Sequence, residues 1–375
     1  MDTNPPPLNP VPPPPPPQFS APPIITPPPT KPPRKSRGWM IVSIILFLLL
    51  GLSMLFNVGS IFSLANIDGA RARGGGPKLD EVVVEEHDSR NKIAIVPVEG
   101  IISGRQVDQA GNSMVEIIKA QLDRAKEDEK VKAVILRVDS PGGEVLASDE
   151  INKLVVKFQK ESSKPVIASM GSLAASGGYY VSAPCRWIVA HEMTITGSIG
   201  VIMSTWNYRG LMNKVGLQPY TFKSGKFKDM LSGSRDPADI PAEERAMVQG
   251  LIDETYGKFK SVVQDGRDRA AEKNKKEAHA LAENWTDFAD GRILTGREAL
   301  KLGFVDQIGN FDDAVDRTEQ IAGIKKANLV EYRERHGLAE LLGVEGKSQS
   351  RAVKIELGIE LPKLEAGKAY FLYLP

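Results

Sequence analysis

The sequence has little of the chemistry on which most metal and disulfide sites depend. Its 375 residues include one cysteine, Cys185, and four scattered histidines. A single cysteine excludes an intramolecular disulfide and a metal site built from several thiolates. The histidines show no metal-ligand spacing such as H-x-x-x-H. The sequence therefore indicates neither a metal nor an organic cofactor.

A strong charge of one sign is also absent. The chain has 48 basic and 47 acidic residues, a net charge of +1. Nucleic-acid-binding surfaces depend on an excess of positive charge, so no nucleic-acid partner is expected.

Proline is abundant only at the start of the chain. Residues 1–33 hold 17 of the 27 prolines, including the run Pro12–Pro17. Such a segment cannot bury a core, so residues 1–37 are expected to form a disordered tail with polyproline II character. It is either a plain flexible extension or a ligand for an SH3- or WW-like partner.

One long apolar run follows this tail. No charged residue lies between Arg37 and Asp68, and residues 38–58 are long enough to cross a hydrocarbon core of roughly 30 Å as a helix. Basic residues before the run favour a cytoplasmic N-terminus. We therefore expect a single-pass anchor in the cell membrane, with the rest of the chain on the extracytoplasmic face. A cleaved signal peptide is the alternative.

The folded part is expected over residues 92–333, after a linker over 59–91. Apolar strands at 93–98, 131–138 and 165–169 alternate with amphipathic helices, which predicts an α/β domain with a mostly parallel sheet. Further helices are expected over 241–264 and 270–283. Residues 334–375 form a C-terminal extension, whose apolar end at 370–374 is expected to dock on a surface.

A candidate nucleophile follows the third strand. Ser176 lies at a strand-to-helix turn in the sequence Ala-Ala-Ser-Gly-Gly-Tyr-Tyr. Small flanking residues let other backbone come close, and the amide of the next residue, Gly177, points where an oxyanion would form. Two glycine-rich turns, at 141–143 and 176–178, lie at the strand ends where such sheets bind ligands.

A serine nucleophile needs a base. The one histidine near these motifs, His191, follows a strand on a loop, and we interpret it as a surface residue. The remaining candidate is a lysine whose amine is kept uncharged by burial. Lys223, Lys226 and Lys228 crowd into six residues, and spacing alone does not choose among them.

Five stretches taken together resemble the signal peptide peptidase A (protease IV) family of the Clp-protease/crotonase superfamily. They are residues 139–143, 172–180, 194–201, 224–229 and 291–306, in an order and spacing that span about residues 92–332. The motif set occurs once, as in the short bacterial form. The resemblance implies a Clp-protease/crotonase-like fold.

The resemblance also implies a serine endopeptidase with a Ser–Lys dyad. By motif, the implied roles are Ser176 as nucleophile, Lys228 as general base, Ser198 as the hydroxyl that orients the lysine, and Gly177 with Gly143, or Gly142, as the oxyanion hole. Family members form homo-oligomeric rings that share the dyad between neighbouring subunits. They cleave remnant signal peptides and other unfolded or membrane-released peptides, which gives the expected substrates here.

Two alternatives remain open from the sequence. The same fold carries crotonase-like acyl-CoA enzymes, although these are normally soluble and use carboxylates. A catalytically inactive membrane scaffold that recruits partners through the proline-rich tail is the other alternative.

Overall fold

The chain divides into two units, residues 1–73 and 74–375, which we describe separately. The computed structural model describes residues 42–53, 76–107, 111–277, 279–334 and 369–372. In the first unit residues 42–53 are helical, while the predicted proline-rich tail and the rest of the predicted anchor lie outside the described residues. None of the helices in the described ranges is both long and apolar enough to cross a membrane.

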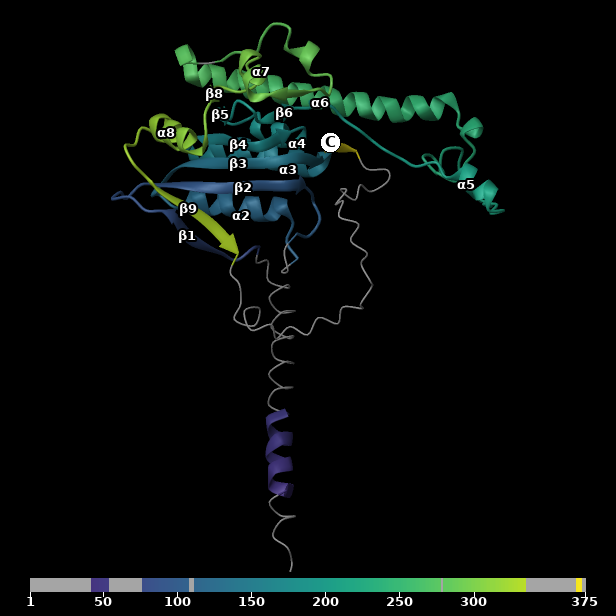
Figure 1. Ribbon diagram of the computed structural model, residues 1–375, viewed down its shortest axis with the longest axis horizontal. Helices are drawn as coiled ribbons and strands as arrows, with labels where there is room; N and C mark the ends of the chain where they lie inside the picture. The colour runs from purple at the N-terminus through teal and green to yellow at the C-terminus, as the bar shows by residue number, and fades with distance from the viewer. Residues whose placement is uncertain (1–41, 54–75, 108–110, 278, 335–368, 373–375) are drawn as a thin grey trace, which may run out of the picture. The chain divides into compact units, whose positions relative to one another are not determined.

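The second unit is a mixed α/β domain, which confirms the predicted class (Figure 1). Its sheet has the order β1-β9-β2-β3-β4-β5-β8, with β10 paired to β3, and β6 paired to β4 and β7. The strands are β1 (Leu79–Glu85), β2 (Lys92–Ile102), β3 (Val131–Glu144), β4 (Val166–Ala175), β5 (Trp187–Ala190), β6 (Ile195–Gly197), β7 (Ile293–Thr295), β8 (Gln307–Ile308), β9 (Asn328–Glu334) and β10 (Tyr370–Leu372).

Most neighbouring strands run parallel. The path β9-β2-β3-β4-β5-β8 is parallel throughout, and β6 is parallel to β4. The antiparallel pairs are β1 with β9, β6 with β7, and β10 with β3. The predicted linker over 59–91 is therefore wrong at its end, because residues 79–85 form an edge strand. The backbone of this strand pairs with β9, which lies more than 240 residues later in the chain. A local sequence pattern does not reveal such a pairing.

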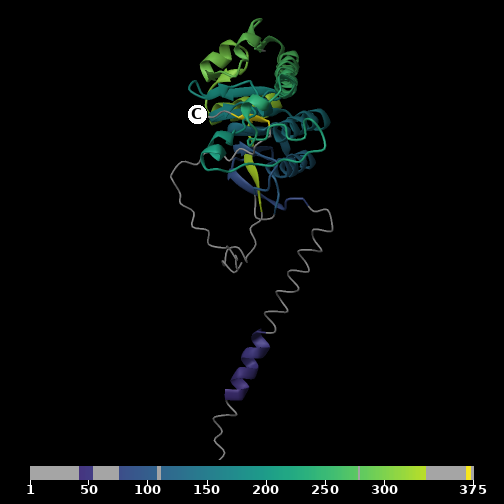
Figure 2. The same ribbon diagram turned by 90° about the vertical axis from the view of Figure 1, so that its right-hand side faces the viewer.

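Helices cover both faces of this sheet (Figures 1 and 2). Alternate residues of β2 separate the two packing layers: Ala94 and Val96 join the large cluster that includes α2, α3 and α4, whereas Ile93 and Ile95 pack with α8. The helices are α2 (Met114–Glu127), α3 (Val145–Ser162), α4 (Gly177–Ser182), α5 (Arg209–Lys214), α6 (Ala242–Asn274), α7 (Gly296–Lys301) and α8 (Phe311–Ala322).

One long helix replaces two predicted ones. α6 runs through the expected break, and the described part of the second predicted helix beyond Asn274 has only the short 3-10 turn Lys275–Glu277. Gly266 lies inside α6, and a Cβ built there would come within 2.4 Å of the Ala183 carbonyl oxygen. The glycine therefore permits a close approach of backbone and does not end the helix.

Residues 203–240 leave the domain as an extended segment, which we call the arm. It carries α5 and the 3-10 turn Pro237–Asp239, and Figure 1 shows α5 well beyond the end of the sheet. Several of its aromatic side chains are exposed: Trp206 is 84% exposed, Tyr220 82% and Phe222 97%. Exposed apolar patches are typical of interaction sites.

Candidate active site

Ser176 lies at the turn between β4 and α4. Its φ of 54° and ψ of −114° are a conformation that residues with a side chain rarely adopt. The turn is held by its own backbone, since the Ser176 amide donates to the Gly197 carbonyl oxygen at 2.8 Å and its carbonyl accepts from the Tyr180 amide at 2.8 Å. The residue is 1% exposed. Strain that the surrounding structure maintains in this way is typical of functional positions.

Ser198 also has a positive φ. Its φ is 48°, and its amide donates to the Arg292 carbonyl oxygen at 2.7 Å. Ser176 and Ser198 line the same cavity, of about 640 Å³. The other lining residues are Gly200, Val201, Ile202, Gln249, Ile252, Asp253, Tyr256, Asp290, Gly291 and Leu372. The structure thus brings together the two serines that the motifs singled out.

The three candidate oxyanion glycines also meet here, but they are not equivalent. The Gly142 amide donates to the buried Ser140 hydroxyl at 3.0 Å, so this amide already has an acceptor. Gly177 is the first residue of α4, where an amide has no acceptor within the helix. A Cβ on Gly177 would lie 3.0 Å from the Gly143 nitrogen. The geometry therefore favours Gly143 with Gly177 as the donor pair.

Close backbone approaches explain why these positions hold glycine. Gly142 has a φ of +98°, and a Cβ there would come within 2.0 Å of the Phe371 carbonyl oxygen. A Cβ on Gly143 would come within 1.9 Å of the Ile102 carbonyl oxygen. Neither contact can relax without moving backbone.

The C-terminal strand β10 lies beside these glycines. It runs antiparallel to the end of β3, with Phe371 opposite Gly143 and Leu372 opposite Gly142. On its other side the Tyr370 amide donates to the Ile202 carbonyl at 3.0 Å, and the Ile202 amide donates back at 3.1 Å. The apolar end of the chain was expected to dock, but nothing in the sequence indicated this place, because the partners lie more than 160 residues away.

Lys228 does not line the cavity. It lies in a turn of the arm, where its amide donates to the Gly225 carbonyl oxygen, and its side chain is exposed. The neighbouring Lys223 pairs with Asp229 at 2.8 Å, and Lys226 pairs with Glu243. Of the three lysines, Lys228 is the one without a carboxylate within ion-pair distance among the described residues.

His191 is no better placed to act as a base. Its side chain is exposed, and its Nδ1 accepts a hydrogen bond from the Met193 amide at 3.2 Å. It is not among the residues that line the cavity. The surface interpretation of this histidine is confirmed.

Two carboxylates line the cavity, and one of them is paired with an arginine. Asp253 and Asp290 are both lining residues. Hydrogen bonds from the Arg292 guanidinium, at 2.6 and 2.8 Å, lower the pKa of Asp290 to about 2. Across the described ranges, no three His, Cys, Asp or Glu side chains converge closely enough to hold a metal ion.

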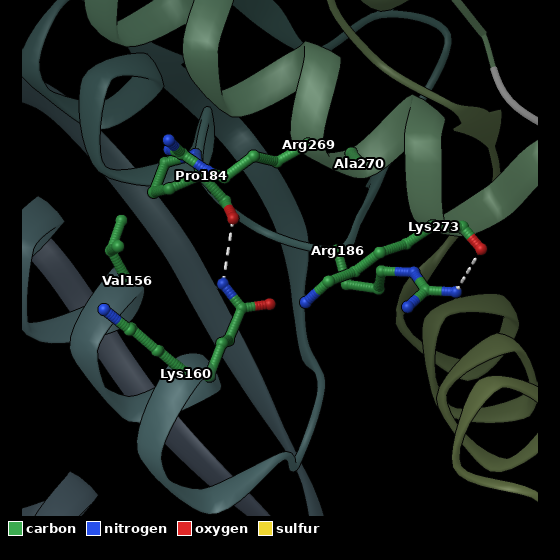
Figure 3. Close-up of a pocket in the computed structure, with 8 residues that line it drawn as sticks. Val156, Lys160, Pro184, Arg186, Arg269, Ala270 and Lys273 are labelled. Atoms are coloured by element: carbon green, nitrogen blue, oxygen red, sulfur yellow. Dashed lines mark hydrogen bonds between the residues drawn. The ribbon is translucent and has the colours of Figure 1, made fainter.

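A second hollow lies elsewhere, between α3 and α6 (Figure 3). It is basic and lined in part by Lys160, Arg186, Arg269 and Lys273, with the Arg186 guanidinium donating to the Lys273 carbonyl oxygen at 2.9 Å. None of the predicted site residues lines it, so it is separate from the serine cavity.

Comparisons with known proteins place the chain in a peptidase family. The model of peptidase family S49 matches residues 158–325. A Synechocystis protein named as a protease is 40% identical over 237 residues, covering 63% of this chain and 76% of that one. An Enterococcus faecium protein named as a signal peptide peptidase SppA is 37% identical over 267 residues, covering 69% and 72%.

A longer relative matches over part of its length. Protease 4 of Haemophilus influenzae is 34% identical over 249 residues, which are 66% of this chain and 38% of that one. A solved membrane-bound stomatin-specific protease aligns at a TM-score of 0.37 with 15% identity, a likeness too low to carry an inference. The identity and coverage of the first two relatives are sufficient to assign the family. This chain belongs to the signal peptide peptidase A family of S49 peptidases and is a serine peptidase.

Proposed function

We propose that the protein is an endopeptidase in which Ser176 is the nucleophile and Lys228 the general base. The observation that carries this proposal is β10. An extended peptide lies along the serine cavity, with backbone partners on both sides, next to a strained serine and two glycine amides. Addition of a peptide strand to the end of a sheet is a general way of binding extended chains.

The chemistry follows from this arrangement. Ser176 Oγ attacks the carbonyl carbon of the bound peptide and gives its proton to the neutral Lys228 amine. The Gly143 and Gly177 amides stabilise the negative charge that develops on the carbonyl oxygen. The C–N bond then breaks, the lysine returns its proton to the leaving amine, and water hydrolyses the acyl-enzyme. Ser198 orients the lysine from within the same cavity.

Lys228 must then come from a neighbouring copy. Among the described residues the cavity is lined by no lysine of its own chain, and Lys228 lies on the arm, whose exposed aromatic residues offer an interface. We propose a homo-oligomeric ring in which each arm reaches the next copy's cavity. A contact of this head-to-tail kind closes into a ring when its rotation allows.

The proposed substrates are remnant signal peptides and other unfolded or membrane-released peptides. A peptide that binds as an added strand must present its backbone, which a folded protein does not do. The apolar residues 38–58 would anchor the enzyme in the cell membrane, with the domain on the extracytoplasmic face where such peptides are released.

The experiment measures hydrolysis of a fluorogenic apolar peptide by the full chain in detergent micelles. We expect Ser176→Ala to lose a factor of about 10³ or more in kcat, because the nucleophile is removed. Ser172→Ala, four residues earlier on β4 and exposed, is the control and should keep its activity.

Two results would contradict the proposal. Equal loss in both serine variants would mean that folding and not nucleophilic attack is affected. A wild-type protein that cuts no peptide would favour the inactive-scaffold alternative. The acyl-CoA alternative is not supported, since the relatives are peptidases.

A further inference from the structure

The basic hollow between α3 and α6 brings together cations from three separate elements (Figure 3). Lys160 lies in the last turn of α3, and Arg186 lies between α4 and β5. Arg269 and Lys273 lie in the C-terminal part of α6. The fold thus collects four positive charges around one small cavity, although they are distant in the sequence.

These cations have no anionic partner. Among the described residues, no carboxylate lies within ion-pair distance of any of the four. The acidic side chains that are close in sequence are engaged elsewhere, since Glu161 pairs with Lys126 at 2.6 Å and Glu277 pairs with Arg317. The charge of the hollow is therefore not neutralised within the described part of the chain.

The neighbouring acceptors are also in use. The Gln159 side-chain amide donates to the Pro184 carbonyl oxygen at 2.9 Å, and its oxygen accepts from the Val166 amide at 3.3 Å. The Lys273 carbonyl oxygen accepts from the Arg186 guanidinium at 2.9 Å. These oxygens are therefore not available to the amines and the guanidinium that line the hollow.

Arg186 is the cation that most needs a counter-charge. It is half-buried, and its guanidinium bonds only neutral oxygens, those of the Asn274 side chain and the Lys273 backbone. Burial, together with the nearby Arg317 guanidinium, lowers the pKa of Arg186. Because an arginine stays charged in a protein, an anion beside it would offset both the burial and the repulsion.

Helix dipoles explain only part of this cluster. A cation near the C-terminus of a helix is stabilised by the helix dipole, which suits Lys160 and Lys273. Arg269 lies before the last turn of α6, and Arg186 lies outside the helices. Two of the four cations therefore have no such reason to be here.

The size of the hollow suits a compact anion. Its volume is about 200 Å³, which is below the roughly 300–1,000 Å³ of pockets for drug-sized ligands. A second hollow of about 390 Å³ adjoins it and shares Gln159, Lys160, Arg186 and Lys273 as lining residues. A phosphomonoester has three terminal oxygens and a charge of about −1.5 to −2 near pH 7, so it matches several cations better than a single carboxylate does.

We propose that this hollow binds a phosphate group, carried either by a soluble phosphomonoester or by a lipid headgroup. Lys160 would donate from α3, and Arg269 and Lys273 from α6, so that the bound group bridges the two helices. Val156 and Pro184 supply an apolar wall for the organic part of the ligand. The inference does not depend on the proposed peptidase function, because none of the predicted site residues lines this hollow.

The first test titrates inorganic phosphate into the full chain in detergent micelles by isothermal titration calorimetry, at constant ionic strength. We expect one site per chain. Arg269→Gln and Lys273→Gln should each weaken binding by about tenfold or more, because a charge-assisted hydrogen bond is lost. Both side chains are exposed, so neither replacement disturbs the core.

Lys258→Gln is the matched control. Lys258 is also an exposed cation on α6, but it does not line the hollow, so its loss should change the affinity by less than about twofold. Absence of phosphate binding in the wild type would overturn the proposal. An equal loss of affinity in Lys258→Gln would also overturn it, since this would show attraction by the general charge of the helix.

Thermal unfolding gives an independent measurement. Phosphate stabilises many proteins through exclusion from their surface, so only the difference between variants is informative. Phosphate should raise Tm more in the wild type and in Lys258→Gln than in the variant that combines Arg269→Gln with Lys273→Gln, because only an intact site adds binding energy to the folded state. Equal increases in all three proteins would refute a specific site.

A third experiment identifies the source of the phosphate group. Glycerol phosphate and a short-chain phosphatidic acid are compared as competitors of inorganic phosphate in the same micelles. A lipid ligand predicts that phosphatidic acid competes at least about tenfold better and that Arg269→Gln abolishes this advantage, whereas a soluble ligand predicts similar competition by both compounds. Failure of both compounds to compete would contradict the proposal.

Discussion

The two halves of the proposed active site are built in opposite ways. Ser176 is buried at the end of a central strand, and its backbone is bonded on both sides. Lys228 is exposed on an arm that contributes little to the core of its own chain. In the proposed mechanism, the serine half is formed within one copy, whereas the lysine half needs a neighbouring copy.

This difference has a physical reason. A strained nucleophile needs a rigid surrounding structure, which only the interior of a domain supplies. A lysine that acts as a base needs its amine desolvated, and an exposed arm can supply this only when another surface covers it. A site shared between copies therefore couples activity to assembly.

The largest effect on activity is expected from replacing Lys228 on the arm. Lys228→Ala should lower kcat for peptide hydrolysis by about 10³-fold or more, because the proton of Ser176 then has no acceptor. Lys226→Ala, two residues earlier, should keep activity within a few-fold, since that amine is paired with Glu243. Loss of activity in Lys226→Ala or Lys223→Ala, with Lys228→Ala still active, would show that another lysine is the base.

The next effect concerns the stability of the domain that contains Ser176. Arg267 is 1% exposed and pairs with Asp306, whose other oxygen accepts from the Ile188 amide at 2.8 Å. Arg267→Met leaves a buried carboxylate without its partner and should lower the free energy of unfolding by about 3–5 kcal/mol. Urea denaturation followed by circular dichroism measures this change.

A surface pair provides the matched control. Arg297, on α7, pairs with Glu192 in the turn after β5, and both side chains are exposed, so Arg297→Met should cost less than about 1 kcal/mol. Similar losses in the two variants would contradict the larger contribution to stability that is expected of the buried pair.

The smallest effect is a pH dependence at the rim of the cavity. Because Arg292 lowers the pKa of Asp290 to about 2, folding favours the ionised form. The resulting contribution to stability is complete above the pKa of the unfolded carboxyl, about 3.8, and is lost as the pH falls toward 2. The stability difference between wild type and Asp290→Asn should therefore shrink between pH 5 and about 2. A difference that grows as the pH falls would contradict the assignment.

Much of the domain around Ser176 could be predicted from the sequence. The turn at Ser176 leads from a strand into a helix as expected, and the capping boxes at Ser113–Glu116 and Thr295–Glu298, which can be read from the sequence, start helices. These features depend on residues that are close in sequence, where spacing carries the information.

The parts that the sequence did not predict depend on distant partners. The edge strand β1 and the C-terminal strand β10 are each fixed by backbone bonds to residues far along the chain. The difference between Gly142 and Gly143 is local: the Gly142 amide donates to the Ser140 hydroxyl two residues earlier, and spacing alone does not show which way that hydroxyl points. The choice of Lys228 among the three lysines rests on the family resemblance, because their spacing in the sequence does not distinguish them.

The most direct test is complementation between two inactive variants. Ser176→Ala and Lys228→Ala chains are co-expressed with different tags, purified through both tags, and assayed on the fluorogenic peptide. If each site takes its lysine from a neighbour, random mixing restores about one quarter of the sites, and activity returns to that order. If mixed oligomers form and stay inactive, serine and lysine act within one copy, and the account of a site shared between copies is wrong.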